Sequence, residues 1–184
     1  IKIGNMKRSL DRIDAMEPLI LDESDSSLDN LALSMIEKSG SLSARLNPTV
    51  AQEVSTLVRS MNCYYSNLIE GHDTHPRDID RALHEQYSNL PEKRALQLEA
   101  RAHIEVQRKI DEGRAHTPEL SISFVKWIHK EFCERLPNEM LWVENIDTTE
   151  RIRVVPGEFR SSFVQVGKHI PPSAQDLPAF MERL

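Results

Sequence analysis

The residues best placed to do chemistry are a serine and a glutamate, Ser66 and Glu70, just before Gly71. A spacing of four residues puts the hydroxyl and the carboxylate on one face of a helix. Glu70 would then lie in the last helical turn, where exposed carbonyl groups disfavour a negative charge by about 0.3–1 kcal/mol. The pattern predicts a polar site that requires a positively charged partner. The alternative is a solvated glutamate that happens to precede a helix-terminating glycine.

Histidines beside acidic or thiol groups suggest a second kind of chemistry, metal binding. His72, Asp73 and His75 lie close together, and His129 and Cys133 are spaced to share a helix face. Neither spacing matches an established metal signature. We therefore expect loop hydrogen bonds in the first group, packing in the second, and no metal site.

A long amphipathic helix over about 48–70 is predicted to position Ser66 and Glu70. Asn47 before Pro48 is a strong start signal, and Gly71 a strong stop, because glycine adopts the left-handed conformation that ends helices. Apolar side chains recur along it at helical spacing: Val54, Leu57, Val58, Met61, Tyr65 and Leu68.

The remaining pattern predicts a mainly α fold with a small β-hairpin. A first helix, with Leu28, Leu31, Met35 and Ile36 facing inward, is expected to end near Gly40. Alternating charged and aliphatic residues at 151–155 predict one strand of the hairpin, and residues 163–167 the other. The expected helices after Gly71 open at Pro76, at Pro91 (running to Gly113), at Ser121 or Ser123 (running to Leu136), and at Ser173 or Asp176.

Composition limits the function classes. The chain has 184 residues, 39% of them hydrophobic, and a net charge of −6. That charge argues against nucleic acid or an anionic membrane surface as a partner. No run of apolar residues is long enough to span a membrane. The two isolated cysteines predict free or buried thiols, so we expect a cytoplasmic location.

Residues 66–71 match a pattern of Ser or Thr, three variable residues, Glu, and Gly or Asn. This resembles the inhibitory helix of Fic-family (filamentation induced by cAMP) proteins. Downstream, Gly157-Glu-Phe-Arg160 and the segment from Val164 to Pro172 resemble the family's β-hairpin flap and proline connector. The resemblance runs from about Leu31 to Leu184. It divides the chain into an arm and first helix (1–47), an inhibitory helix (48–71) and part of a Fic-like domain (72–184), with a flap at about 151–170.

The resemblance implies an autoinhibited nucleotidyltransferase that moves AMP from ATP, with Mg²⁺, to a Ser, Thr or Tyr hydroxyl of a target protein. The family's catalytic signature, HPFx(D/E)GNGRxxR, does not occur in this sequence. No catalytic residue can therefore be assigned, and this chain alone is expected neither to transfer AMP nor to hold ATP or Mg²⁺. Its last apolar stripe, ending at Leu184, leads us to expect a fragment whose final helix continues.

The resemblance also implies roles for particular residues. Glu70 would pair with the second arginine of the absent signature and so occupy the γ-phosphate's place. Ser66 would support the carboxylate or touch the nucleotide, and Gly71 would end the helix. The flap would dock an unknown target protein through main-chain hydrogen bonds, and a homodimer stays open. The docking residues would be Gly157, Arg160, Val164, Gln165, Val166 and Gly167.

Three other interpretations remain. The chain would fit a helical protein–protein adaptor, because amphipathic helices serve equally well there. It would also fit an antitoxin-like inhibitor that supplies Glu70 in trans, although such an inhibitor needs no target-binding hairpin. A related transferase with another nucleotide or donor is the third.

Overall fold

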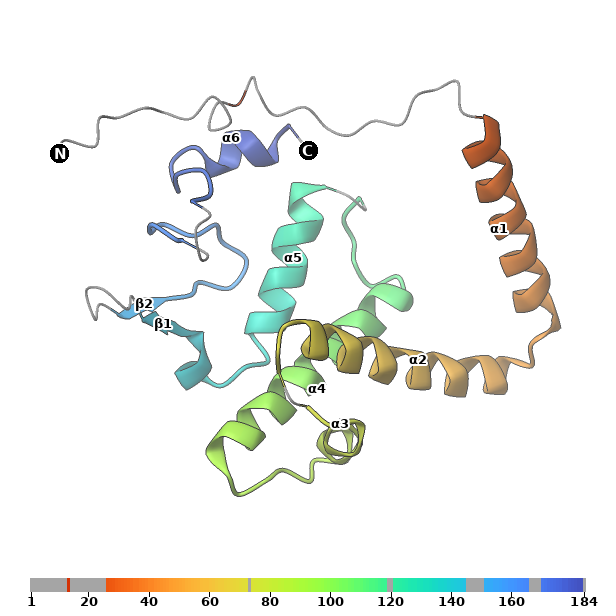
Figure 1. The fold of residues 1–184 in the computed structure, drawn as a ribbon, viewed down its shortest axis with the longest axis horizontal. Helices are drawn as coiled ribbons and strands as arrows, with labels where there is room; N and C mark the ends of the chain where they lie inside the picture. Colours follow the sequence, from red (N-terminus) through yellow and green to blue (C-terminus); the bar gives the residue numbers. More distant parts are fainter. Residues whose placement is uncertain are drawn as a thin grey trace.

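The computed structural model describes residues 13, 26–72, 74–118, 121–144, 151–165 and 170–183. These form a mainly helical structure with one small antiparallel sheet (Figure 1). The helices are α1 (Ser26–Arg45), α2 (Pro48–Ile69), α3 (Pro76–Leu83), α4 (Pro91–Asp111), α5 (Ile122–Cys133) and α6 (Leu177–Met181). A short 3₁₀ helix, Asn138–Leu141, precedes the strands β1 (Trp142–Glu144) and β2 (Arg151–Arg153). Within the described ranges, no helix is both long and apolar enough to cross a bilayer.

The helices begin where local signals place them. The Asn47 side chain accepts a hydrogen bond from the Thr49 backbone N–H at 2.9 Å, and Pro48 follows as the first helical residue. Ser121 rather than Ser123 caps α5, because its hydroxyl accepts from the Phe124 N–H at 3.1 Å. Such caps satisfy backbone donors that the first turn leaves without partners.

The core lies where α2, α3 and α4 meet. Cys63, Ile79, Ala100 and Ile104 form its buried centre, and Tyr64 and Leu83 pack around them. Small residues on α4 let α2 approach closely; the Cys63 Sγ lies 3.7 Å from the Ala100 carbonyl oxygen. The segment that carries Ser66 and Glu70 is therefore anchored on the packed part of the fold.

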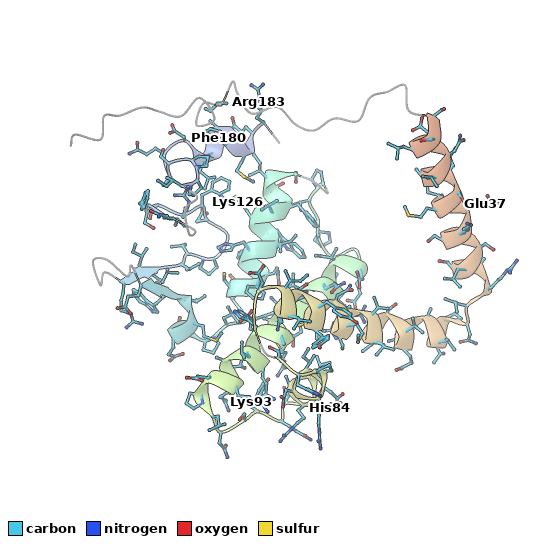
Figure 2. All side chains as sticks on the ribbon, viewed as in Figure 1. Glu37, His84, Lys93, Lys126, Phe180 and Arg183 are labelled. Atoms are coloured by element: carbon cyan, nitrogen blue, oxygen red, sulfur yellow. The ribbon has the colours of Figure 1, made fainter. Side chains whose placement is uncertain are left out.

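The prediction for the first helix was wrong in two respects. α1 continues through Gly40 to Arg45, so the helix does not end near Gly40 as predicted. A Cβ at Gly40 would meet nothing within 4 Å, so no close contact requires glycine there. No residue of α1 is buried. In Figure 2 this helix, marked by Glu37, lies apart from the other helices, so its apolar residues do not face inward.

The sheet was predicted with the wrong partner for its second segment. β2 pairs with β1, in the register Trp142 with Arg153 and Glu144 with Arg151. Residues 163–165 form no strand, and the rest of the expected second strand lies outside the described residues. A small two-stranded antiparallel sheet is therefore present, but the partner of residues 151–153 is the segment before them rather than the predicted one after them.

Candidate functional site

Glu70 and Gly71 form a complete helix-ending motif. Gly71 has φ of +78°, and its N–H donates to the Leu68 carbonyl oxygen at 3.2 Å. The His72 N–H donates to the Asn67 carbonyl oxygen at 2.8 Å. These two bonds and the left-handed residue define a Schellman motif. The backbone that carries Glu70 is therefore fixed by the motif, as the sequence predicted.

A buried side-chain hydrogen bond holds the loop that follows. Asn67 Nδ2 donates to Thr74 Oγ1 at 3.1 Å, and both residues are almost fully buried. On the same side, His72 Nδ1 lies 3.3 Å from a Glu99 carboxylate oxygen on α4. The chain reversal after α2 is thus tied to the helix it leaves by the Asn67–Thr74 bond, and it lies close to α4.

An ion pair holds α2 one helical turn before Cys63, the residue that α2 contributes to the core. Arg59 is buried, and its Nη1 donates to the Asp111 carboxylate at the end of α4 at 2.9 Å. Arg59 also bonds the Thr56 hydroxyl. Between Arg59 and Asn67, burial and the nearby Glu99 charge raise the pKa of the Cys63 thiol to about 12. Cys63 therefore stays protonated and acts as a packing residue, in keeping with the predicted buried thiol.

The Glu70 carboxylate itself is exposed. In the part of the chain that the structure describes, it makes no ion pair, and Ser66 makes no hydrogen bond to it. The last turn of α2 also contains no basic residue that would offset the helix dipole. The Ser66 hydroxyl and the Glu70 carboxylate thus lie exposed at the C-terminal end of α2. No described residue supplies the expected cation.

The segment after β2, residues 154–165, which we call the flap-like segment, is attached to α5 at Gly157. The Gly157 N–H donates to His129 Nδ1 at 3.0 Å, so that ring nitrogen is the acceptor of this bond. The other ring nitrogen of His129 lies 3.4 Å from Cys133 Sγ. Burial raises the pKa of the Cys133 thiol. His129 and Cys133 therefore serve packing and hydrogen bonding, as the sequence suggested, and their role is to position the segment.

Arg160 braces this segment from within. Its guanidinium donates to the carbonyl oxygens of Ser162, at 2.7 Å, and of Pro172. Lys126 of α5, labelled in Figure 2, pairs with Glu158 at 3.0 Å and lies over the Phe159 ring. Arg160 thus links the predicted flap to the proline connector.

A cavity of about 620 Å³ lies between the hairpin, α5 and the flap-like segment. Its volume falls in the range of ligand or peptide side-chain pockets. Apolar side chains dominate the wall, with charged groups at intervals. Its lining residues are His129, Val143, Glu144, Ile152, Arg153, Val154, Val155, Glu158, Phe159, Arg160, Ser161, Ser162, Phe163, Val164 and Gln165.

An ion-pair network joins α4 to α5, and sequence reasoning missed it. Glu105 pairs with Arg101 at 2.8 Å and with Arg135 at 3.2 Å. Glu131 pairs with Lys109 at 2.7 Å and with Arg135 at 2.6 Å. Burial opposes ionisation of Glu105, but the two arginines outweigh it and lower the pKa of its carboxyl. The hydrogen bond from Lys109 is the main cause that lowers the pKa of Glu131.

The predicted site residues form two separate groups. Ser66, Glu70 and Gly71 lie together at the end of α2. Arg160, Val164 and Gln165 line the cavity, whereas Gly157 is buried against α5. Val166 and Gly167 lie outside the described residues. The i, i+4 spacing of Arg101 with Glu105 and of Glu131 with Arg135 was the signal for the network.

The chain matches no protein-family model, and comparisons with curated proteins and with solved structures give no match.

Proposed function

We propose that this chain is the regulatory and target-docking part of an autoinhibited protein AMP-transferase of the Fic type. In this proposal α2 is the inhibitory helix and Glu70 its inhibitory group. The observation that carries the proposal is the exposed, unpaired carboxylate on a helix end whose backbone is fixed by a Schellman motif and by the buried Asn67–Thr74 bond. An inhibitory group needs this combination, because rigid placement reduces the entropy lost when it binds.

Glu70 would inhibit by competing with a phosphate of ATP for one arginine. An arginine that binds the γ-phosphate of ATP also binds a carboxylate through two parallel hydrogen bonds. Glu70 would compete for that arginine, and ATP would bind with its phosphates misplaced. Since phosphoryl-type transfer depends on positioning and on neutralised charge, misplacement alone is enough to suppress it. The arginine, the catalytic histidine and the Mg²⁺ ligands would come from a segment outside these 184 residues.

The cavity beside the flap-like segment supports a docking role. Its apolar wall, with Val164 and Phe163, suits an apolar side chain of a bound peptide, and Gln165 lines the same wall. Gly157 and Arg160 would act indirectly: Gly157 fixes the segment on α5, and Arg160 joins it to the connector. This gives Arg160 a supporting role in addition to its place in the cavity wall.

The test is AMP incorporation from labelled ATP by the complete protein that contains this chain. Glu70→Gly is expected to raise self-modification about tenfold or more, the factor that corresponds to about 1.4 kcal/mol or more of lost inhibition. Glu53→Gln is the matched control, since Glu53 is an exposed carboxylate on the same helix but far from the C-terminal end of α2. Equal rates for wild type, Glu70→Gly and Glu53→Gln would refute the inhibitory role.

A helical adaptor is the second candidate function, and the exposed apolar side chains of α1 and α2 favour it. An adaptor would show no AMP incorporation in any variant. The labelled-ATP assay therefore separates the two functions.

A further inference from the structure

One edge of β2 is open to a further strand. The Val154 N–H donates to the Leu141 carbonyl oxygen at 2.8 Å, in line with the register of β1 and β2. Residues of an antiparallel pair alternate between those that bond across the ladder and those whose main-chain groups point outward. By that alternation the N–H and C=O groups of Arg151 and Arg153 point away from β1. Within the described ranges these groups have no main-chain partner on that side.

The same edge borders the 620 Å³ cavity. Four consecutive residues, 152–155, line the cavity, and the flap-like segment supplies much of the remaining wall. Apolar side chains of this wall are well exposed: Val143 is 57% exposed, Val155 55% and Phe163 65%. An open strand edge beside an apolar wall suits an extended peptide, because main-chain bonds supply affinity and the wall selects side chains.

The two faces of the sheet differ in side-chain chemistry. Successive residues of a strand point to opposite faces, and residues directly opposite each other in the register share a face. Val143 and Ile152 are opposite each other, and both line the cavity. Arg151 and Arg153 point to the other face. A strand added beside β2 would therefore have apolar neighbours on one face and two arginines on the other.

The two arginines have no acidic partner. Both are exposed. Within the described ranges, Arg151 lies over the Trp142 ring, Arg153 makes a long bond of 3.5 Å to Asn138, and neither arginine forms an ion pair. Two exposed cations at alternate positions of an open strand edge favour acidic side chains on an added strand, because opposite charges across a strand pair attract.

The carboxylates nearby do not cancel this charge. Glu158 in the cavity wall is already paired with Lys126 at 3.0 Å. Glu144 is opposite Arg151 in the register, but it forms no ion pair in the described part of the chain. Arg160 adds a further cation to the wall. The surroundings of this edge are therefore cationic, although the whole chain has a net charge of −6.

We propose that the open edge of β2 binds an extended acidic segment of a partner protein, in which one apolar residue lies between two acidic ones. The segment continues the sheet. Its acidic residues lie opposite Arg151 and Arg153, and its apolar residue lies opposite Ile152, on the face that lines the cavity. This inference rests on the docking role proposed for the cavity. It places the main-chain contacts on β2 rather than on residues 164–167, which the family resemblance implied.

The first experiment measures the charge preference by fluorescence anisotropy. A short labelled peptide with a Glu-Val-Glu centre is titrated with the chain from about 1 μM to 1 mM, a range that brackets a weak Kd. A Lys-Val-Lys peptide should bind at least about tenfold more weakly, because like charges then face each other. Arg151→Glu combined with Arg153→Glu should reverse that preference. Arg77→Glu, at an exposed arginine on α3, is the matched control and should leave the preference unchanged.

N-methylated peptides test the main-chain contacts without any change in the protein. By the alternation of the ladder, the amides of the two glutamates face β2 and the valine amide faces away. Methyl groups on the glutamate amides should weaken binding at least about tenfold, whereas a methyl group on the valine amide should have a much smaller effect. In NMR spectra of the ¹⁵N-labelled chain, the peptide should shift the amide signals of Arg151 and Arg153.

Several results would overturn the proposal. These are no binding of the Glu-Val-Glu peptide, equal binding of the Lys-Val-Lys peptide, and equal effects of the two methylations. Shifts confined to residues 163–165 would place docking on the flap-like segment instead, and self-association of the chain through β2 would make a second copy the occupant. No ATP is present, so loss of the Glu70→Gly effect with intact peptide binding would refute the inhibitory role alone.

Discussion

Replacing Gly157 by alanine should destabilise the chain far more than the same change at Gly71. Both glycines have φ of +78°, so alanine is strained at either position. They differ only in their surroundings. An added Cβ at Gly71 would meet nothing within 4 Å, whereas at Gly157 it would lie 3.0 Å from Lys130 Cβ and 3.3 Å from the Lys126 carbonyl oxygen.

The expected magnitudes follow from that difference. The left-handed conformation costs a residue with a Cβ about 1–2 kcal/mol, and this term applies to both variants. Gly157→Ala adds an overlap with the helical backbone and stem of α5, which costs about 1–3 kcal/mol when the surroundings cannot move. Displacing the segment to relieve the overlap would instead break the 3.0 Å bond from the Gly157 N–H to His129. The variant therefore loses stability along either path.

The assay is urea unfolding followed by tryptophan fluorescence and by circular dichroism. Trp127 on α5 and Trp142 on β1 lie in the elements around the Gly157 attachment, so fluorescence should report that region. We expect Gly71→Ala to lower the free energy of unfolding by about 1–2 kcal/mol, and Gly157→Ala by at least about 1 kcal/mol more. Equal losses in the two variants would refute the close packing of the flap-like segment on α5.

Two further predictions concern the elements that hold the site. In a urea titration, Asn67→Ala should lower the free energy of unfolding by about 1–3 kcal/mol, because it leaves the buried Thr74 hydroxyl without its partner. Ser66→Ala, at an exposed neighbouring position, should change the free energy of unfolding by no more than about 0.5 kcal/mol. Acid should weaken the α4–α5 network: the folded-state pKa values of Glu105 and Glu131 are lowered, so their contribution is complete above the unfolded-state value of about 4.3 and is lost as pH falls below it. The urea midpoint of unfolding, measured from pH 7 to 3, should therefore decrease once the pH falls below about 4.3 in the wild type. It should decrease less in Glu105→Gln. Parallel pH curves for the two proteins would contradict a stabilising role for the ionised Glu105.

Local signals in the sequence were enough to predict most helix ends. Asn47 with Pro48, Ser121, and Gly71 each act through the backbone of their own turn, so no distant residue is needed to interpret them. Gly40 was misread as a helix end because glycine lowers helix propensity by only about 1 kcal/mol. Twenty residues of otherwise helical sequence outweigh that cost in α1.

The faces and pairings could not be predicted in the same way. The buried face of α2 carries an arginine and an asparagine, and each is satisfied by a partner distant in the chain or across a loop, Asp111 and Thr74. Hydrophobic periodicity alone selects the opposite face. The strand partner of 151–153 was missed for a similar reason, since β1 has only three residues and too short an alternation to be recognised.

The inhibitory role of Glu70 is best measured as the rate of AMP incorporation by the full-length protein with glycine in place of Glu70, divided by the rate with Glu70 present. We expect a ratio of about ten or more, the result that follows when a charge-assisted inhibitory contact is lost. A ratio near one, with Glu53→Gln giving the same value, would contradict it.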